Sequence, residues 1–153
     1  MEKEKTIEVL NTLVTINNDR IEGYETASKE TEEKDLKRLF SQFTSTSLKC
    51  KQQLENEVFN LGGTPSESTK TSGKFFRVWM DLKAALTGND QKAILNSCEF
   101  GEDEAVNTYN NVLKNNLSDL TLEQQNLINA QHALIKADHD EVKNMRDMLV
   151  END

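Results

Sequence analysis

The sequence predicts an all-α protein built as a four-helix bundle, and three observations support this. The 153 residues include one proline and six glycines, a composition that favours helices over a turn-rich β fold. Apolar residues recur with the period of an amphipathic helix over four long segments. Short polar or glycine-containing breaks separate these segments. A chain of this length is expected to form a single domain, residues 1–153.

The first two helices are expected over about residues 6–29 and about residues 34–60. A polar break at residues 31–33 separates them. Gly62 and Gly63 follow the second helix and form a C-terminal stop signal. Because the break is so short, the two helices should form an antiparallel hairpin.

A long crossover is expected next, with a helix of its own. Residues 64–73 are rich in Ser, Thr and Gly and are typical of a loop. An apolar-rich segment over about residues 74–86 predicts a shorter helix. We expect this helix to lie on the side of the bundle and to seal it with Trp79 and with Phe75 or Phe76.

The last two long helices form a second predicted hairpin. Asn89 or Asp90 can cap a helix that runs to about residue 115. A short turn at residues 118–121 leads into a final helix over about residues 122–149. Two hairpins joined by a long crossover make the ferritin-like arrangement of a four-helix bundle.

A polar residue interrupts the apolar stripe near the middle of each long helix. These four residues are Asn17, Ser47, Glu102 and Asp138, the last placed between Leu134 and Val142 in its stripe. A rise of 1.5 Å and a turn of 100° per residue bring all four to about the same level, pointing inward. A polar group inside a bundle must be paired, hydrated, metal-bound or neutralised.

One interpretation of this ring is a metal site. Glu102 and Asp138 would supply hard oxygen ligands to one divalent ion (iron, manganese or zinc), with Asn17 or water completing the shell. His139 and Glu25 lie beside the inward stripes and are further candidate ligands.

The other interpretation is a hydrogen-bonded layer that sets the register of the helices. Asn17 or Ser47 would then donate to the carboxylates of Glu102 and Asp138, and one carboxylate would stay protonated. The sequence leaves both interpretations open.

Catalytic motifs are missing from the sequence, which favours a non-catalytic protein without settling the question. A di-iron centre needs a Glu-x-x-His motif on each of two helices, and the chain contains none. GxSxG, P-loop and GxGxxG motifs are also missing. The only histidines are His132 and His139, both in the last helix.

Composition points to a cytoplasmic protein that binds neither nucleic acid nor membranes. A net charge of -9 and a pI near 4.8 disfavour phosphate backbones and anionic lipids. No apolar run approaches the roughly 20 residues needed to span a bilayer, and no signal peptide is visible. Cys50 and Cys98 are isolated and lie on apolar faces, as expected of reduced core cysteines.

Several short motifs are shared with a known family. They are residues 10–13, 17–24, 61–65, 72–73, 79–88, Cys98-Glu99, 101–103, Tyr109 and His139-Asp140. On these motifs the chain resembles the bacterial ferritin-like four-helix-bundle proteins grouped as a domain of unknown function. The resemblance covers nearly the whole chain and implies the same fold. It implies no activity and supplies no established ligand.

Two functions follow as hypotheses. The first is a non-catalytic bundle with a structural, stress-linked or interaction role, whose partner is a second copy or another protein. The alternative is a degenerate metal-binding ferritin-like protein or oxidase with a mid-bundle carboxylate site. A third interpretation, a small-ligand pocket beneath the helix that carries Trp79, rests on that helix alone.

Overall fold

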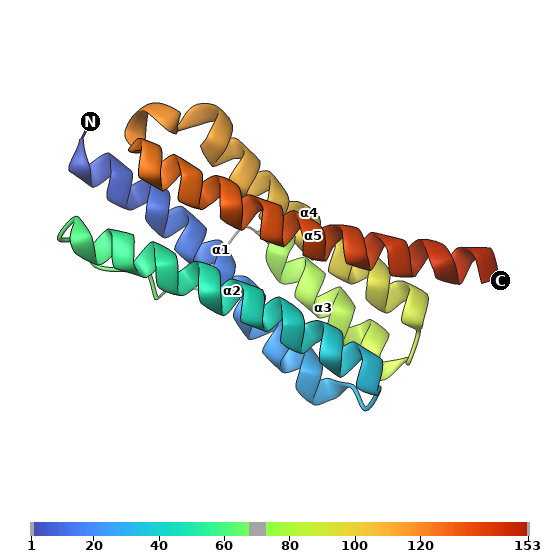
Figure 1. The fold of residues 1–153 in the computed structure, drawn as a ribbon. Coiled ribbons are helices and arrows are strands. Elements are labelled where there is room, and N and C mark those ends of the chain that lie inside the picture. Colours follow the sequence, from blue (N-terminus) through green and yellow to red (C-terminus); the bar gives the residue numbers. More distant parts are fainter. Residues whose placement is uncertain (1, 68–72, 153) are drawn as a thin grey trace.

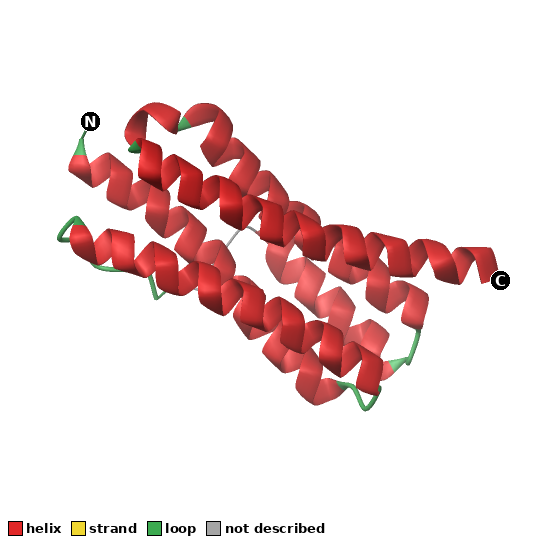
Figure 2. Cartoon of the chain, in the orientation of Figure 1, coloured by secondary structure: helices red, strands yellow, loops and turns green. Residues whose placement is uncertain are grey.

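Five α-helices and one short 3-10 turn make up the part of the chain that the structure describes (Figure 2). The structure is a computed structural model that describes residues 2–67 and 73–152, with residues 73–79 and 149–152 described by their backbone alone. The elements are α1 (Lys3–Glu30), α2 (Lys34–Asn60), α3 (Gly73–Thr87), α4 (Gln91–Asn115), the 3-10 turn η1 (Leu117–Asp119) and α5 (Leu122–Asn152). No strand occurs within these described ranges, so the predicted all-α class is confirmed.

The helices pair in chain order. α1 and α2 lie antiparallel and side by side, and so do α4 and α5 (Figure 1). α1 and α5 run in one direction, whereas α2 and α4 run in the other (Figure 1). The shorter α3 packs mainly along α4 and also contacts α1. The crossover therefore adds a helix to one side of the bundle formed by the four long helices.

Local signals explain where the helices end. At the end of α2, Gly62 adopts a φ of +80°, and the N–H groups of Gly62 and Gly63 bind the carbonyls of Phe59 and Val58. This left-handed conformation suits glycine because it has no Cβ. Of the two predicted caps for α4, Asp90 takes the role, since its side chain accepts a hydrogen bond from the N–H of Ala93.

Side chains of α1 hold the start of the crossover against that helix. The amide of Asn11 donates to the carbonyl of Thr64 and accepts from the N–H of Ser66. One and two turns further along, Thr15 binds the hydroxyl of Ser66, and Asn18 donates to its carbonyl. These polar residues share one face of α1 because they are spaced by three or four positions.

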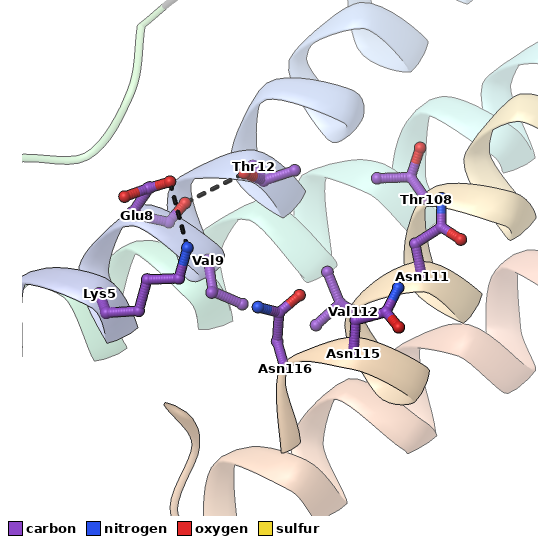
Figure 3. Close-up of a pocket in the computed structure, with 9 residues that line it drawn as sticks. All are labelled: Lys5, Glu8, Val9, Thr12, Thr108, Asn111, Val112, Asn115 and Asn116. Carbon is purple, nitrogen blue, oxygen red and sulfur yellow. Dashed lines mark hydrogen bonds and ion pairs between the residues drawn. The ribbon is translucent and has the colours of Figure 1, made fainter. Parts of the chain in front are cut away.

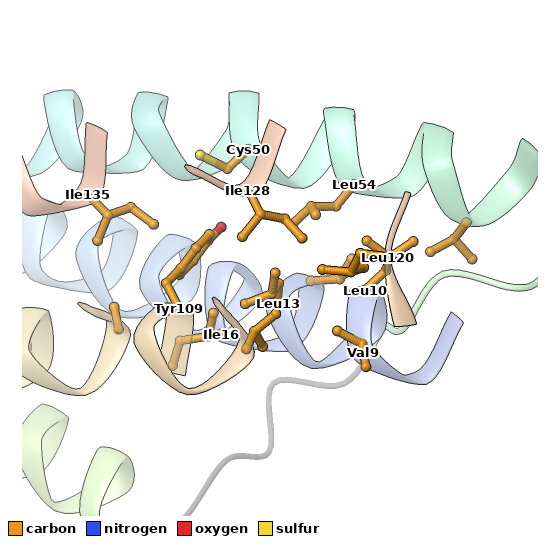
Figure 4. Close-up of a cluster of buried hydrophobic side chains, with 14 residues drawn as sticks. Val9, Leu10, Leu13, Ile16, Cys50, Leu54, Tyr109, Leu120, Ile128 and Ile135 are labelled. Atoms are coloured by element: carbon orange, nitrogen blue, oxygen red, sulfur yellow. The ribbon is translucent and has the colours of Figure 1, made fainter. Parts of the chain in front are cut away.

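The apolar core is divided into two clusters. The cluster toward the start of α1 contains Val9, Leu10, Leu13, Val14, Ile16, Cys50, Leu54, Val58, Ala105, Tyr109, Val112, Leu120, Ile128 and Ile135 (Figure 4). The cluster toward the end of α1 contains Tyr24, Ala27, Leu36, Leu39, Phe40, Phe43, Leu82, Ala85, Ile94, Leu95, Cys98 and Val142. The polar residues predicted at the middle of the bundle lie between these stretches of sequence on each helix.

The inward stripe of α5 differs from the predicted one by one residue. Leu134 is 39% exposed, whereas Ile135 is completely buried. One residue corresponds to a rotation of about 100° around the helix axis, which moves a side chain from core to surface. Leu82 and Ala85 of α3 are buried, as expected for a helix that covers the bundle. The packing predicted for Trp79 and its neighbouring phenylalanines lies outside the described side chains.

Candidate functional site

The middle of the bundle holds the four polar residues that the sequence places there. Asn17, Ser47 and Glu102 are completely buried, and Asp138 is 4% exposed. They come from α1, α2, α4 and α5 respectively, one from each long helix. The predicted inward orientation of these four residues is therefore observed, and their hydrogen-bond partners decide what they do.

Arg20 of α1 donates hydrogen bonds to three of these four residues. Its side chain is completely buried. Its Nε and Nη2 atoms donate to Oε2 and Oε1 of Glu102 at 2.9 and 2.6 Å. Nη1 donates to the hydroxyl oxygen of Ser47 at 2.6 Å, and Nη2 also donates to Oδ2 of Asp138 at 3.2 Å. We refer to Arg20, Ser47, Glu102 and Asp138 as the polar centre.

Aromatic rings complete the surroundings of Arg20. The guanidinium carbon lies 5.7 Å from the ring centroid of Tyr24 and 5.9 Å from that of Phe43, within cation–π range. The hydroxyl of Tyr24 donates to Oε2 of Glu102 at 3.0 Å. Burial by itself lowers the pKa of Arg20, but the charge and hydrogen bonds of Glu102, together with the charges of Tyr24 and Asp138, outweigh burial and raise it. Arg20 is therefore a permanent cation at the middle of the bundle.

The polar centre holds two carboxyl groups against one guanidinium. Burial raises the pKa of Glu102, and the nearby carboxylate of Asp138 acts in the same direction. The charge and hydrogen bonds of Arg20 oppose this shift. If both carboxyl groups are ionised, the centre carries one negative charge more than its cation balances.

Asp138 lies at the edge of the polar centre nearest to solvent. Its Oδ1 accepts a hydrogen bond from Nε2 of Gln42 at 3.2 Å, while its Oδ2 faces Arg20. The same Nε2 atom also donates to Glu141 at 2.7 Å. Gln42 of α2 therefore covers the buried ion pair where α2 meets α5.

A second polar layer lies about two turns from the polar centre along α4 and α5. Nδ2 of Asn17 donates to the hydroxyl of Tyr109 at 2.9 Å, and that hydroxyl donates to Oε1 of Gln131 at 2.8 Å. Nε2 of Gln131 then donates to the carbonyl of Cys50 and to the side chain of Gln53. Among the described residues, Oδ1 of Asn17 is buried without a hydrogen-bond partner. This chain of bonds links α1, α4, α5 and α2.

The hydrogen bonds differ from those expected of either predicted interpretation. Asn17 donates to Tyr109 and to the carbonyl of Leu13, not to a carboxylate. Ser47 accepts a hydrogen bond from Arg20 instead of donating to an acid. Both differences have the same cause. The guanidinium of Arg20 already donates the hydrogen bonds that the carboxylates of Glu102 and Asp138 need.

His139, the fourth predicted metal ligand, faces away from the polar centre. Its Nε2 lies 2.6 Å from Oδ1 of Asp103 on α4, and its Nδ1 lies 3.1 Å from Oδ1 of Asp140. Its side chain is 19% exposed, so it lies at the α4–α5 boundary. Glu25 is exposed on α1, and Glu99 is ion-paired with Arg146 at 2.5 Å.

The polar centre does not fit a divalent ion as it is arranged. Both carboxylate oxygens of Glu102 already accept hydrogen bonds from Arg20, and the guanidinium fills the space between Glu102 and Asp138. Within residues 2–67 and 73–152, no group of three His, Cys, Asp or Glu side chains is arranged to hold a metal ion. The predicted ligands Glu102, Asp138, Asn17 and His139 are thus not brought together around one open position.

The two cysteines are not activated. Both are buried and free. Burial raises the pKa of Cys50 to about 11 and raises that of Cys98 further. A thiol whose pKa is raised this far is a poor nucleophile at neutral pH. The predicted assignment of both residues to the core agrees with their burial.

A separate groove of about 210 Å3 lies between α1 and α4 (Figure 3). Lys5 and Glu8 line it from α1, and Asn111, Asn115 and Asn116 line it from the end of α4. None of its lining residues belongs to the polar centre or to the second polar layer. The groove is therefore distinct from the candidate site.

Sequence reasoning missed Arg20 and Tyr24 as members of the site. Arg20 is three positions after Asn17 and four before Tyr24, so it lies on the inward face of α1. Arginine is almost never completely buried unless it is paired, so the burial of Arg20 depends on the carboxylates of Glu102 and Asp138. The spacing from Asn17 and the acid at Glu102 were the signals that could have identified it.

Comparison with known proteins identifies a family that the chain matches. A family model described as Domain of unknown function (DUF2383) matches residues 5–115. The match includes Arg20, Ser47 and Glu102, whereas Asp138 lies beyond it. No curated protein matches the chain. None of the described helices has the apolar length that crossing a bilayer requires.

Proposed function

Since the chain belongs to the DUF2383 family, whose description carries no activity to transfer, we propose that it is a non-catalytic, ferritin-like helical bundle of the bacterial cytoplasm. Its role is structural, stress-linked or based on interaction with a partner. The order and direction of the four long helices, with α3 in the crossover, support the ferritin-like assignment. Two buried free cysteines suit a reducing compartment.

The closed polar centre is the observation that carries this proposal. All three guanidinium nitrogens of Arg20 and both carboxylate oxygens of Glu102 are bonded to other side chains of the bundle. A catalytic site needs an open position where a substrate or water can bind, and a metal site needs ligand atoms that face the ion and not another cation. Groups that satisfy one another in this way set helix register instead.

The interaction role has support at one end of the bundle. Phe59 is 63% exposed at the end of α2, and Leu122 is 72% exposed at the start of α5. Leu117 in η1 is 42% exposed at the same end. A hydrogen bond from Gln124 to Glu57 shows that these parts of α2 and α5 are close together. Three exposed apolar side chains at one end of the bundle support a contact surface there, and a second copy is the proposed partner.

Sedimentation equilibrium over a range of concentrations tests the self-association. We expect a reversible dimer in the wild type and a monomer in the Phe59→Ser/Leu122→Ser variant. Phe100→Ser is the matched control, because Phe100 is 66% exposed on α4. A wild type that stays monomeric at every concentration would contradict dimerisation and direct the search to other protein partners.

The alternative function is a degenerate metal-binding protein or oxidase with one divalent ion at Glu102 and Asp138, assisted by Asn17 or His139. Its support is that carboxylates from α4 and α5 approach the same atom, Nη2 of Arg20. An ion could occupy that position only if Arg20 moved out of it, because the guanidinium keeps its charge.

Metal content distinguishes the two functions. Untagged protein is analysed by inductively coupled plasma mass spectrometry, before and after incubation with iron, manganese or zinc. The proposed function predicts no stoichiometric metal and a melting temperature that added ions leave unchanged. About one ion per chain, lost in Glu102→Gln, would reject it in favour of the alternative, since binding to the native state raises stability.

A further inference from the structure

We propose that the polar centre is a cation site whose occupant is the guanidinium of Arg20, and that it accepts a divalent metal ion only when this side chain is removed. The inference rests on the proposed non-catalytic function, in which the wild type binds no metal. It goes further because it assigns to the Arg20 guanidinium the position that a divalent ion would occupy.

The first support is that oxygen atoms from three other helices surround the guanidinium of Arg20. Glu102 of α4, Asp138 of α5 and Ser47 of α2 each place an oxygen within 3.2 Å of a guanidinium nitrogen. The hydroxyl of Tyr24 lies beside them, bonded to Glu102. Carboxylate and hydroxyl oxygens are the ligands that manganese and magnesium prefer, whatever cation they currently surround.

The second support is the charge of the site. Two carboxyl groups face a single positive charge, and burial leaves little water to screen the difference. When both carboxyl groups are ionised, a divalent ion would balance both of them, whereas Arg20 balances one. The donor set is therefore better matched in charge to a divalent ion than to the guanidinium that it holds.

The third support is the space that Arg20 occupies. It is among the largest side chains that are completely buried within the described residues. Truncation to alanine would leave a cavity lined by the oxygens of Glu102, Asp138 and Ser47 and by the rings of Tyr24 and Phe43. Polar cavities of this kind take up water or ions, whereas apolar ones stay empty.

The wild-type chain excludes the ion for the same reasons. An arginine guanidinium cannot lose its proton in a protein, so it cannot make way for a second cation by becoming neutral. A divalent ion at the carboxylates would lie against it and be repelled. Arg20 thus stabilises the polar centre and also keeps a metal ion from binding there.

Isothermal titration with Mn2+ tests the proposal on four forms of the full chain. They are the wild type, Arg20→Ala, the double variant Arg20→Ala/Glu102→Gln and the exposed control Arg38→Ala. We expect Arg20→Ala to bind about one Mn2+ per chain, at least roughly tenfold more tightly than any other form. Its melting temperature should rise with Mn2+ and with low millimolar guanidinium, which replaces the missing group.

Each other result overturns a stated claim. Failure of Arg20→Ala to gain Mn2+ binding, with a metal-free wild type, rejects this inference and leaves the proposed function intact. Stoichiometric Mn2+ in the wild type rejects the proposed function itself. If Arg20→Ala is unfolded alone, far-UV circular dichroism follows the same titration. Helix recovered by Mn2+ then supports the inference, and no recovery while Arg20→Lys stays folded rejects it.

Discussion

Arg20 and Glu102 form a two-pronged ion pair at the middle of the bundle, with Nε and Nη2 at 2.9 and 2.6 Å from the two carboxylate oxygens. Both side chains are completely buried. The pair joins α1 to α4, and bonds from Arg20 to Ser47 and Asp138 extend it to α2 and α5. All four long helices are therefore held at one level by one guanidinium.

Removing one partner of this pair should destabilise the protein strongly. Glu102→Ala leaves the Arg20 charge buried with only Asp138 and Ser47, so we expect a loss of about 3–5 kcal/mol in the free energy of unfolding. Urea denaturation measures it. Glu25→Ala, an exposed glutamate on α1, should change stability by no more than about 0.5 kcal/mol. Equal stability of the two variants would contradict a stabilising ion pair.

Replacing both partners should cost much less than the two single changes together. In Arg20→Met/Glu102→Leu no charge of the pair remains buried, and the new apolar side chains fill part of the space. We expect its loss of stability to be about 1–3 kcal/mol smaller than the sum of the single variants. Urea denaturation of the three variants gives this coupling energy directly. Additive losses would show that the two residues act independently.

The hydroxyl group of Tyr109 should stabilise the folded protein. Tyr109→Phe removes the group that accepts from Asn17 and donates to Gln131, and both amides stay buried. We expect a loss of about 1–3 kcal/mol, the usual cost of an unpaired buried polar group. Thermal or urea unfolding measures it. A Tyr109→Phe variant as stable as the wild type would mean that the hydroxyl contributes little.

His139 should make stability depend on pH. Burial alone lowers its pKa, but hydrogen bonds to Asp140 and Asp103 outweigh burial and raise it above 6.5. Both ring nitrogens face carboxylates, so both bonds require the protonated ring. The stabilisation is therefore complete below about pH 6.5 and is lost as pH rises through the raised pKa.

Melting temperatures from pH 5 to 9 check the contribution of His139. The stability advantage of the wild type over His139→Gln should shrink as pH rises. A constant difference between the wild type and His139→Gln at all pH values would show that the ring does not titrate as expected.

The ionised carboxylate of Asp19 should lower the stability of the folded protein at high pH. It is 5% exposed, and its Oδ2 lacks a hydrogen-bond partner among the described residues. Burial, and then the charge of Glu22, raises its pKa from 3.8 to about 7. Because the folded pKa is raised, the unfolded state loses its proton first, and stability falls as pH rises from about 4 to about 7.

An isosteric amide isolates the effect of Asp19. Asp19→Asn should be more stable than the wild type at pH 8, and the difference should disappear near pH 4. Asp81→Asn, on the exposed side of α3, is the control and should show no such crossover. A wild type that is more stable than Asp19→Asn at pH 8 would mean that the carboxylate is paired and not merely buried.

Most of the helical architecture could be predicted from local information. The bounds of α2 agree with the expected ones, and the ends of the other helices lie within about three residues of theirs. Gly62 and Asp90 mark helix termini through their own backbone and side-chain preferences. The inward placement of Asn17, Ser47, Glu102 and Asp138 followed from helical period and rise alone.

Sequence alone thus determined the helices, their order and the inward placement of Glu102 and Asp138, because these depend on spacing and on short-range preferences. Tertiary structure decided what the acids bind. Whether an inward carboxylate meets a metal, a water or an arginine depends on which side chain from another helix reaches it. Arg20 and Glu102 are 82 positions apart in the chain. Only the packing of α1 against α4 brings the guanidinium between the carboxylates, and this placement makes the predicted polar ring a closed ion pair.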